Sequence, residues 1–167
     1  ANEAANILAE TVAGDVESFV ALMNQRAAEL GCTGTHFVNP HGLHDDDHYT
    51  TARDICRFVE EAMEHDTFQE IVSTADCYID ATNLSDQRHF FNTNGLLSNL
   101  RYMGYVYPDA IGVKTGSTDA AGLCLAAAAE RDGVYLISVV LGAQRVPGTT
   151  GSEGFTQFSE SIRLLDH

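Results

Sequence analysis

Basic residues are scarce in this sequence, which has nine Lys and Arg against 24 Asp and Glu in 167 residues and a formal net charge of −15. An acidic surface of this kind repels the phosphates of nucleic acids and of anionic lipids. The chain also lacks an apolar run of about 18 residues, the length at which a segment is predicted to span a membrane. We therefore expect neither nucleic acid nor a membrane among the contacts of this chain.

Clustered cysteines are lacking as well. The four cysteines are scattered and form no Cys-x-x-Cys pair, which argues against a zinc site, a redox motif and a disulfide framework. Two of them, Cys56 and Cys124, stand in apolar patterns and are expected to be small core residues. No cofactor is predicted.

The first ten residues, ANEAANILAE, contain neither the basic segment nor the apolar stretch of a signal peptide. They already show helical spacing, and no initiator Met precedes them. We therefore expect the sequence to be a piece cut from a longer protein. Its length suits one domain, predicted over 1–167.

Residues 1–75 are predicted to be mainly helical. Apolar residues recur at helical spacing over 3–13, over 15–30 with Asp15 as the N-terminal cap, and from Thr51 onward, with a short helix at 68–72. An ordered loop rich in Gly, His, Asn and Asp is expected between them, over 32–51. In the first helix the apolar stripe consists of Ala4, Ile7, Leu8 and Val12.

Residues 76–167 are predicted to form mainly a sheet. Short strands are expected at 76–81 and 87–93, and a further strand at 110–116. The residues 122–143 read as two strands joined at Asp132-Gly133, a strong signal for a tight hairpin. An amphipathic helix is predicted over 152–166. The fold class is therefore α+β: an antiparallel sheet closed by a C-terminal helix, beside a separate helical part.

The tripeptide Lys114-Thr115-Gly116 ends the strand predicted at 110–116. Alternation places Lys114 and Gly116 on one side and Thr115 on the other. A glycine lets another backbone approach, while the lysine adds a cation and the threonine a hydroxyl. These groups suit an extended ligand that ends in a carboxylate, although such a tripeptide also occurs by chance.

Other polar groups allow two interpretations. The histidines and aspartates of the loop could bind a divalent cation, but an acidic solvated loop is the more usual reading, and no metal site is predicted. The helical carboxylates of Asp54 and Glu60 are expected to be solvated. The tyrosines of RYMGYVYPDA, near the tripeptide, could line a ligand cleft or merely cover the sheet. The loop residues in question are His36, His41, His44, His48, Asp45, Asp46 and Asp47, and the tyrosines are Tyr102, Tyr105 and Tyr107.

Ser-x-x-Lys, Ser-x-Asn and Lys-Thr-Gly form the signature set of penicillin-binding proteins and class A β-lactamases. The chain resembles the low-molecular-mass penicillin-binding proteins, the serine D-alanyl-D-alanine carboxypeptidases, over nearly its whole length. The similar segments are ANEAANILAE, FVALMNQRAAELGCTGTHFVNPHGL, HYTTARDICRF, NTNGLL, GVKTGSTDAAGLCLAAAAERDG and LISVVLGA. The resemblance implies a partial β-lactamase/DD-peptidase-like fold.

The resemblance also implies roles for single residues. Ala1-Asn2 would be the last two residues of Ser-x-Asn, with Asn2 orienting the substrate amide. Lys114 would strengthen the field near the nucleophile, and the backbone N–H of Ser117 would form part of the oxyanion hole.

The resemblance assigns the remaining residues to substrate binding. Thr115 would bind the terminal carboxylate of the substrate, Gly116 would also contact the substrate, and Thr118 could line the pocket. Thr93 stands where some family members carry an arginine aimed at the substrate carboxylate.

The departures from the family pattern concern the nucleophile. No Ser-x-x-Lys occurs in the sequence, and the family places this motif upstream of Ser-x-Asn. We therefore expect an incomplete catalytic domain that neither hydrolyses D-Ala-D-Ala peptides nor binds penicillin covalently. The apolar strand at 134–141 would lack a neighbour, so self-association through that edge is predicted.

For the full-length parent, the resemblance implies peptidoglycan remodelling outside the cytoplasmic membrane, in a secreted or anchored protein. Its substrate would be a stem peptide ending in D-Ala-D-Ala, cleaved through an acyl-enzyme that β-lactams can also form. A β-lactamase or D,D-endopeptidase of the same fold is an alternative. So is a noncatalytic module that binds peptidoglycan or a partner protein.

Overall fold

The computed structural model describes residues 2–151 and 153–167. The helical part forms as its caps and spacing predict: the Asp15 carboxylate accepts a hydrogen bond from the Ser18 N–H at 2.7 Å, and the Thr51 hydroxyl accepts one from the Asp54 N–H at 3.1 Å. The fourth helix begins at Asp66 rather than at residue 68. The helices are α1 (Asn2–Ala13), α2 (Val16–Glu29), α3 (Ala52–Ala62), α4 (Asp66–Ser73) and α5 (Thr156–Leu165).

The main sheet is antiparallel, with three strands in the order β3-β4-β5, so that β3 and β5 form its two edges. Asp132 and Gly133 join β4 to β5 with positive φ angles of 51° and 76°, as the predicted tight hairpin requires. A separate two-stranded hairpin is formed by β1 and β2. The strands are β1 (Asp76–Ile79), β2 (Arg88–Phe91), β3 (Ala110–Thr118), β4 (Gly122–Arg131) and β5 (Val134–Ala143).

The boundaries of two elements beside the tripeptide and at the C-terminus also differ from the sequence-based expectation. The strand β3 continues to Thr118, so the Lys-Thr-Gly tripeptide lies inside the strand and not at its end. The helix α5 begins at Thr156, whereas the prediction began at Ser152, which lies outside the described residues. The glycine-rich segment before Thr156 has too little apolar periodicity to continue the helix in the N-terminal direction.

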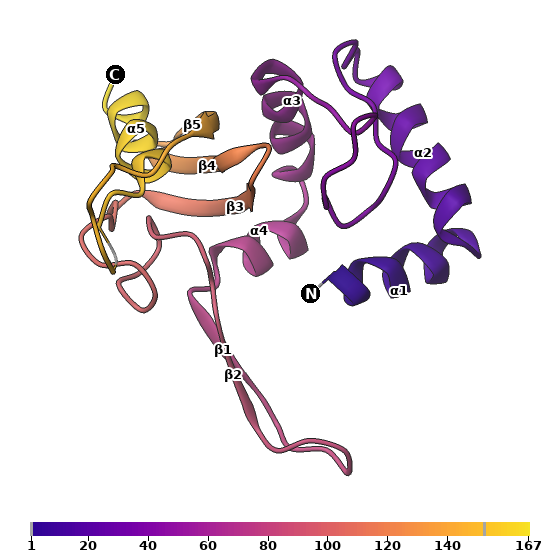
Figure 1. Ribbon diagram of the computed structural model, residues 1–167, viewed down its shortest axis with the longest axis horizontal. Helices are drawn as coiled ribbons and strands as arrows, with labels where there is room; N and C mark the ends of the chain where they lie inside the picture. The colour runs from indigo at the N-terminus through magenta and orange to yellow at the C-terminus, as the bar shows by residue number, and fades with distance from the viewer. Residues whose placement is uncertain (1, 152) are drawn as a thin grey trace.

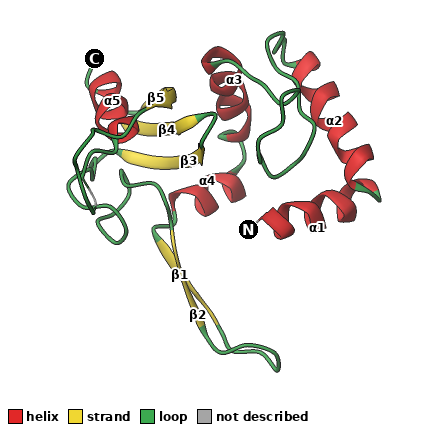
Figure 2. Ribbon diagram, viewed as in Figure 1, coloured by secondary structure: helices red, strands yellow, loops and turns green. Residues whose placement is uncertain are grey.

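Helices cover both faces of the sheet (Figures 1 and 2). On one face, Phe158 and Leu165 of α5 pack against Ala127 and Ala129 of β4. On the other face, α3 and α4 meet a second cluster that contains Ala128. Alternation along β4 thus sends consecutive alanines to opposite cores, and their small side chains let helices approach from both sides. The predicted α+β class is confirmed.

The apolar stripe of α1 is not buried, contrary to what helical amphipathicity alone suggests. Ile7, Leu8 and Val12 are 61%, 65% and 68% exposed, and only Ala9 of this helix is buried. The reason is that α1 makes its contacts mainly with α2 (Figure 1). Within the described part of the chain, no helix combines the length and apolar character needed to cross a membrane.

The β1–β2 hairpin projects away from the main sheet (Figure 2). Tyr78 and His89 face each other across its strands with ring centroids 3.9 Å apart, and the His89 Nε2 lies 2.5 Å from the Asp76 carboxylate. Asn92 follows β2, where the chain returns to the body of the molecule. The hairpin therefore connects directly to the segment that carries Thr93.

Candidate active site

The edge strand β3 pairs with β4 on one side, and no strand of the described residues pairs with its other side. Along it, Lys114 faces Ala126, Thr115 faces Leu125 and Gly116 faces Cys124. A Cβ added at Gly116 would meet nothing nearer than the Cys124 Cβ at 3.9 Å. Packing within the chain therefore does not require glycine here, and the open side leaves space for another backbone.

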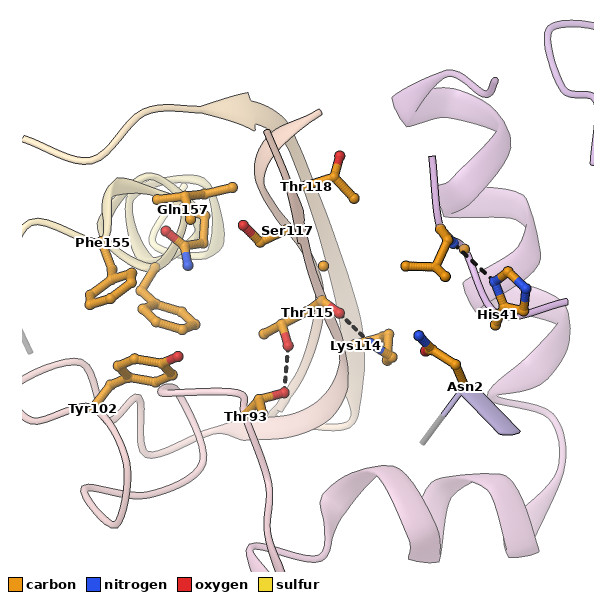
Figure 3. Close-up of a pocket in the computed structure, with 15 residues that line it drawn as sticks. Asn2, His41, Thr93, Tyr102, Lys114, Thr115, Ser117, Thr118, Phe155 and Gln157 are labelled. Carbon is orange, nitrogen blue, oxygen red and sulfur yellow. Dashed lines mark hydrogen bonds between the residues drawn. The ribbon is translucent and has the colours of Figure 1, made fainter. Parts of the chain in front are cut away.

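A cavity of about 450 Å³ runs along this strand (Figure 3). Residues from the start of α1, from the segment after β2 and from β3 contribute to its wall. The structure thereby brings together all the residues to which the sequence assigned a catalytic or binding role: Asn2, Thr93, Lys114, Thr115, Gly116, Ser117 and Thr118. Their individual roles remain predictions.

Thr93 is held in place by asparagines on both sides. The Asn92 amide donates to the Val72 and Thr74 carbonyls at 3.2 and 3.0 Å, which ties the segment to the end of α4. The Asn94 side chain is 1% exposed and donates to the Gly112 carbonyl at 2.9 Å, which ties it to β3. These contacts place the Thr93 and Thr115 hydroxyls 2.5 Å apart.

Lys114 is the only lysine of the sequence. Its ammonium donates to the Thr115 carbonyl oxygen and faces the cavity from β3 (Figure 3). Part of the side chain is open to solvent on the cavity side, while surrounding protein atoms displace water and lower the pKa of the amine from its usual value. A lysine with a lowered pKa gives up its proton more readily, which suits proton transfer near a ligand.

The helical part supplies the opposite wall of the cavity. Asn2 reaches it from the first turn of α1, and the loop that precedes α3 contributes His41, Gly42 and Leu43. The Asn39 carboxamide accepts from the Gly42 N–H at 2.7 Å and donates to the Leu43 carbonyl at 3.0 Å, shaping the turn. Ala1, assigned with Asn2 to the end of Ser-x-Asn, lies outside the described residues.

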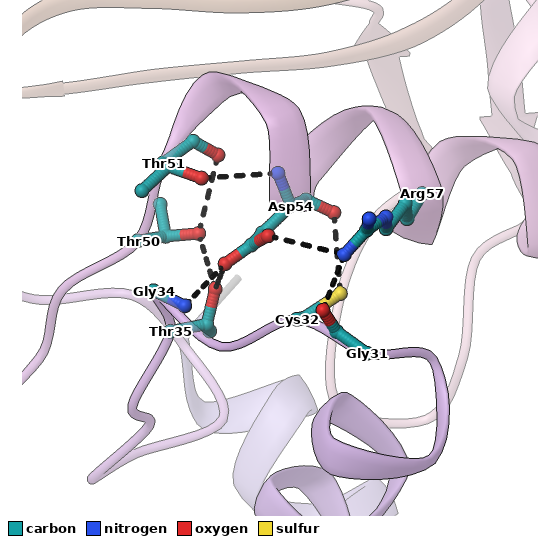
Figure 4. A network of polar contacts seen from close by, with 8 residues as sticks. All are labelled: Gly31, Cys32, Gly34, Thr35, Thr50, Thr51, Asp54 and Arg57. Atoms are coloured by element: carbon teal, nitrogen blue, oxygen red, sulfur yellow. Dashed lines mark hydrogen bonds and ion pairs between the residues drawn. The ribbon is translucent and has the colours of Figure 1, made fainter.

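Asp54 anchors this loop, and its predicted solvation is wrong. The side chain is 3% exposed, and its Oδ2 accepts hydrogen bonds from the Gly34 N–H and the Thr35 hydroxyl, each at 2.9 Å (Figure 4). A Cβ at Gly34 would lie 2.6 Å from a Thr51 methyl, so glycine is required. Helix periodicity placed Asp54 on a surface, but the loop folds over it. Glu60 is exposed, as predicted.

The histidines of the loop bind its own backbone. The His36 Nδ1 lies 2.7 Å from the Asp47 carbonyl, and the His48 Nδ1 accepts from the Val38 N–H at 3.1 Å. Burial is the largest effect on His48 and lowers its pKa. Across residues 2–151 and 153–167, no three His, Cys, Asp or Glu side chains gather in a way that could hold a metal ion.

An aromatic wall closes the cavity on the side of α5, and the sequence did not reveal it in full. Tyr102 packs against Phe155 and Phe158 with ring centroids 4.6 and 5.3 Å apart, and Gln157 lies beside them (Figure 3). Tyr102 therefore lines the cavity, whereas Tyr107 is buried in the core. The sequence predicts only an amphipathic helix in this region, and nothing in the sequence singles out Gln157.

The cavity is thus equipped to hold an extended ligand along β3. It offers an open strand edge, two hydrogen-bonded hydroxyls, a lysine and the amide of Asn2. All four cysteines are free, and Cys56 and Cys124 are partly rather than fully buried. The sequence contains no Ser-x-x-Lys, so these residues do not include a nucleophile and base at that spacing.

Comparison with known proteins agrees with this geometry. The family model described as D-alanyl-D-alanine carboxypeptidase matches residues 1–145. The chain is 35% identical over 142 residues to the D-alanyl-D-alanine carboxypeptidase DacF of Bacillus subtilis, covering 85% of this chain and 34% of the relative. It is 38% identical over 166 residues to DacC of Escherichia coli, covering 98% of this chain and 36% of that protein.

Among solved structures, the D-alanyl-D-alanine carboxypeptidase of Mycobacterium tuberculosis H37Rv superposes with a TM-score of 0.76 at 29% identity, covering 95% of this chain and 57% of the other. The chain therefore has part of the DD-peptidase fold, as predicted. It spans about a third of the length of each of these two curated relatives. With a family match over most of its residues, the chain belongs to the D-alanyl-D-alanine carboxypeptidase family.

Proposed function

We propose that this chain forms the substrate-holding wall of a serine D-Ala-D-Ala carboxypeptidase that remodels peptidoglycan outside the cytoplasm. The observation that carries the proposal is the single cavity that gathers Asn2, Thr93 and the Lys114–Thr118 stretch along an open strand edge. Family membership supports the same ligand class. The ligand is a stem peptide ending in D-Ala-D-Ala, or a β-lactam in its place.

The peptide lies extended against β3, and its backbone pairs with the open edge beside Gly116. Asn2 orients the peptide amide from the helical side. The Thr115 hydroxyl binds the terminal carboxylate, with Thr93 holding that hydroxyl in place. The side chain of Thr118 lines the same stretch of the cavity.

Hydrolysis needs a nucleophile and a base besides these residues. A serine activated by a lysine at Ser-x-x-Lys spacing attacks the peptide carbonyl, D-alanine leaves, and water hydrolyses the acyl-enzyme. In this scheme the Ser117 N–H donates to the oxyanion, and Lys114, with its lowered pKa, assists proton transfer. The 167 residues supply recognition and stabilisation of charge, and the whole protein supplies the attack.

The test is a titration of the chain, followed by heteronuclear NMR, with an N-acetylated peptide ending in D-Ala-D-Ala. We expect the backbone signals of residues 114–118 to shift on binding. The same peptide ending in L-Ala-L-Ala serves as the control and should bind at least about tenfold more weakly, a difference of about 1.4 kcal/mol. Equal shifts with both peptides, or none with either, would overturn the proposal.

We also propose that the chain self-associates through β5. This strand forms the sheet edge opposite β3, and Val134, Tyr135 and Leu141 on it are 56%, 51% and 41% exposed. A long, apolar edge is a template for pairing with another strand. Pairing of two β5 edges would join two sheets across a two-fold axis.

A further inference from the structure

Gln157 is a buried amide whose oxygen has no hydrogen-bond partner among the residues that the structure describes. The residue is 4% exposed, and its Oε1 is buried and unpartnered. Buried amides are nearly always hydrogen-bonded, so an exception calls for a physical reason. Figure 3 shows the Gln157 amide between Phe155 and the strand that carries Ser117, inside the cavity. We therefore expect a ligand of the cavity to supply the missing partner.

The chemistry of this amide calls for a ligand group that both donates and accepts hydrogen bonds. The Gln157 Oε1 accepts and needs a donor opposite it, whereas its Nε2 carries two N–H donors. The terminal torsion of a glutamine is broad and roughly two-fold, so either end of the amide can face the cavity. A carboxylate only accepts, and Oε1 repels it. A carboxamide carries both an oxygen and an NH₂ group, so it pairs with Gln157 in either orientation.

The surroundings of this amide favour a neutral ligand group over a charged one. Tyr102 packs against Phe155 and Phe158, so Gln157 lies beside an aromatic wall of the cavity. A charged group held there loses its hydration without gaining a partner of opposite sign. The dipole of α5 further opposes a cation, because Gln157 lies in the first turn of this helix.

The other donors of the cavity do not require a charged ligand group either. Within the described part of the chain no arginine lines the cavity, and its one lysine, Lys114, donates to the Thr115 carbonyl. The hydroxyls of Thr93 and Thr115 share one hydrogen bond, so one hydroxyl proton of the pair remains for a ligand. That proton can be donated to the oxygen of a carboxamide as well as to a carboxylate.

We propose that Gln157 binds a neutral carboxamide of the ligand, with Oε1 accepting from its NH₂ group and Nε2 donating to its oxygen. The carboxamide is either the amidated C-terminus of the peptide or an amidated side chain within it. At an amidated C-terminus, the Thr115 hydroxyl donates to the carboxamide oxygen in place of a carboxylate. Gln157 is thus a specificity-determining residue that favours amidated peptides over their free-acid counterparts. This inference rests on the proposed function of the cavity and narrows its class of ligand.

The test measures, by NMR titration at neutral pH, the affinity of the chain for two matched pairs of peptides. N-acetyl-D-Ala-D-Ala, as the free acid and as the C-terminal amide, tests a terminal carboxamide. N-acetyl-Gln-D-Ala-D-Ala and N-acetyl-Glu-D-Ala-D-Ala, both with a free C-terminus, test a side-chain carboxamide. In one pair we expect the amidated member to bind at least about fivefold more tightly, because it makes a hydrogen bond that the acid cannot make. The pair that shows this preference identifies the source of the carboxamide.

Variants separate the role of Gln157 from the general negative charge of the chain, which repels every acidic peptide. Gln157→Met removes both hydrogen-bonding ends at similar volume and should reduce the preference to less than about twofold. Gln87→Met makes the same change at an exposed position of the β1–β2 hairpin and should leave the preference at its wild-type value. Gln157→Glu keeps an acceptor, so it should still bind the amidated peptide while binding the acid more weakly. This second variant guards against a folding defect in Gln157→Met.

Two outcomes would overturn the role of Gln157 while the proposed function stands. One is equal affinity of the wild type for acid and amide in both pairs. The other is a preference for the amide that persists unchanged in Gln157→Met. A wild type that binds none of the four peptides would overturn the proposed function itself.

Discussion

The Thr93 and Thr115 hydroxyls lie 2.5 Å apart and join the segment after β2 to the strand that lines the cavity. Thr93 reaches this position because Asn92 and Asn94 bind α4 and β3. The contact therefore couples the integrity of the fold to the shape of the site.

Replacing both threonines by valine should test this coupling. Thr93→Val and Thr115→Val each remove one hydroxyl at nearly constant volume, and each should lower the free energy of unfolding by about 1 kcal/mol. The double variant should lose less free energy of unfolding than the two single variants together, because both single substitutions remove the same hydrogen bond. Urea unfolding of the four proteins measures the coupling. Strict additivity would show that the two hydroxyls act independently.

Asp54→Ala should destabilise the chain strongly. The buried carboxylate accepts hydrogen bonds from the Gly34 N–H and the Thr35 hydroxyl. Removing the carboxylate takes this acceptor away from both donors. We expect the free energy of unfolding to fall by about 3 kcal/mol in denaturant titrations. Glu60→Ala removes the same charge from an exposed position of α3 and should change it by less than about 0.5 kcal/mol. Similar losses in both variants would contradict the anchoring role of Asp54.

The stability of the chain should decrease as the pH falls below about 6.5, in part through His48. Burial lowers the pKa of folded His48, so the unfolded chain binds more protons in this window and stability rises with pH. Protonation of the His48 Nδ1 also breaks the hydrogen bond that this atom accepts from the Val38 N–H. Asp45 opposes the shift, while His36 and His41 add to it.

Thermal melts of wild type and His48→Gln at pH 7 and pH 5 measure this contribution. The drop in melting temperature between the two pH values should be smaller in the variant than in the wild type. His65→Gln, at an exposed position before α4, should leave the drop unchanged. An identical drop in wild type and His48→Gln would show that His48 does not contribute to the loss of stability at low pH.

Self-association through β5 should depend on ionic strength. A net charge of −15 on each copy opposes pairing, and salt screens this repulsion. Size-exclusion chromatography with light scattering should show a dimer fraction that rises with salt and with protein concentration. Leu141→Glu should abolish the dimer, whereas Leu84→Glu, at a 90% exposed site on the hairpin, should not. A monomer under all conditions would rule out the β5 interface.

A fluorescent penicillin should not label this chain covalently, since the sequence holds no Ser-x-x-Lys. Gel fluorescence and intact mass should both show the unmodified protein after prolonged incubation. Reversible binding in the cavity is compatible with this outcome. A stoichiometric mass increase would identify a nucleophile among the serines and threonines of the chain. It would refute the proposal that these 167 residues bind the substrate without supplying the nucleophile.

Local signals predicted most of the fold. The Asp132-Gly133 turn, the caps at Asp15 and Thr51, and the apolar periodicity each act within a few residues, and all are confirmed. Two features that the sequence did not indicate are tertiary. Asp54 is buried because a distant loop folds over it, and the stripe on α1 is exposed because that helix contacts mainly α2.

The same distinction applies to the site. Lys114-Thr115-Gly116 is contiguous in sequence and could be recognised there, and resemblance to a family added Asn2 and Thr93. Gln157 has no motif around it and reaches the cavity only because α5 packs across the sheet. A side chain of this kind becomes visible when an unpartnered buried atom is found beside a cavity.

Because one side of β3 has no strand partner in the described part of the chain, a bound peptide can extend the sheet. A peptide that pairs there becomes a fourth strand, and the β3 amide protons that point outward change from solvent-bonded to ligand-bonded. Ligand binding in the cavity should then slow the hydrogen–deuterium exchange of the backbone amides of residues 114–118. The exchange rate of the amides on the β5 edge should not change when the ligand binds. The two edges of one small sheet would in this way report separately on ligand and on partner.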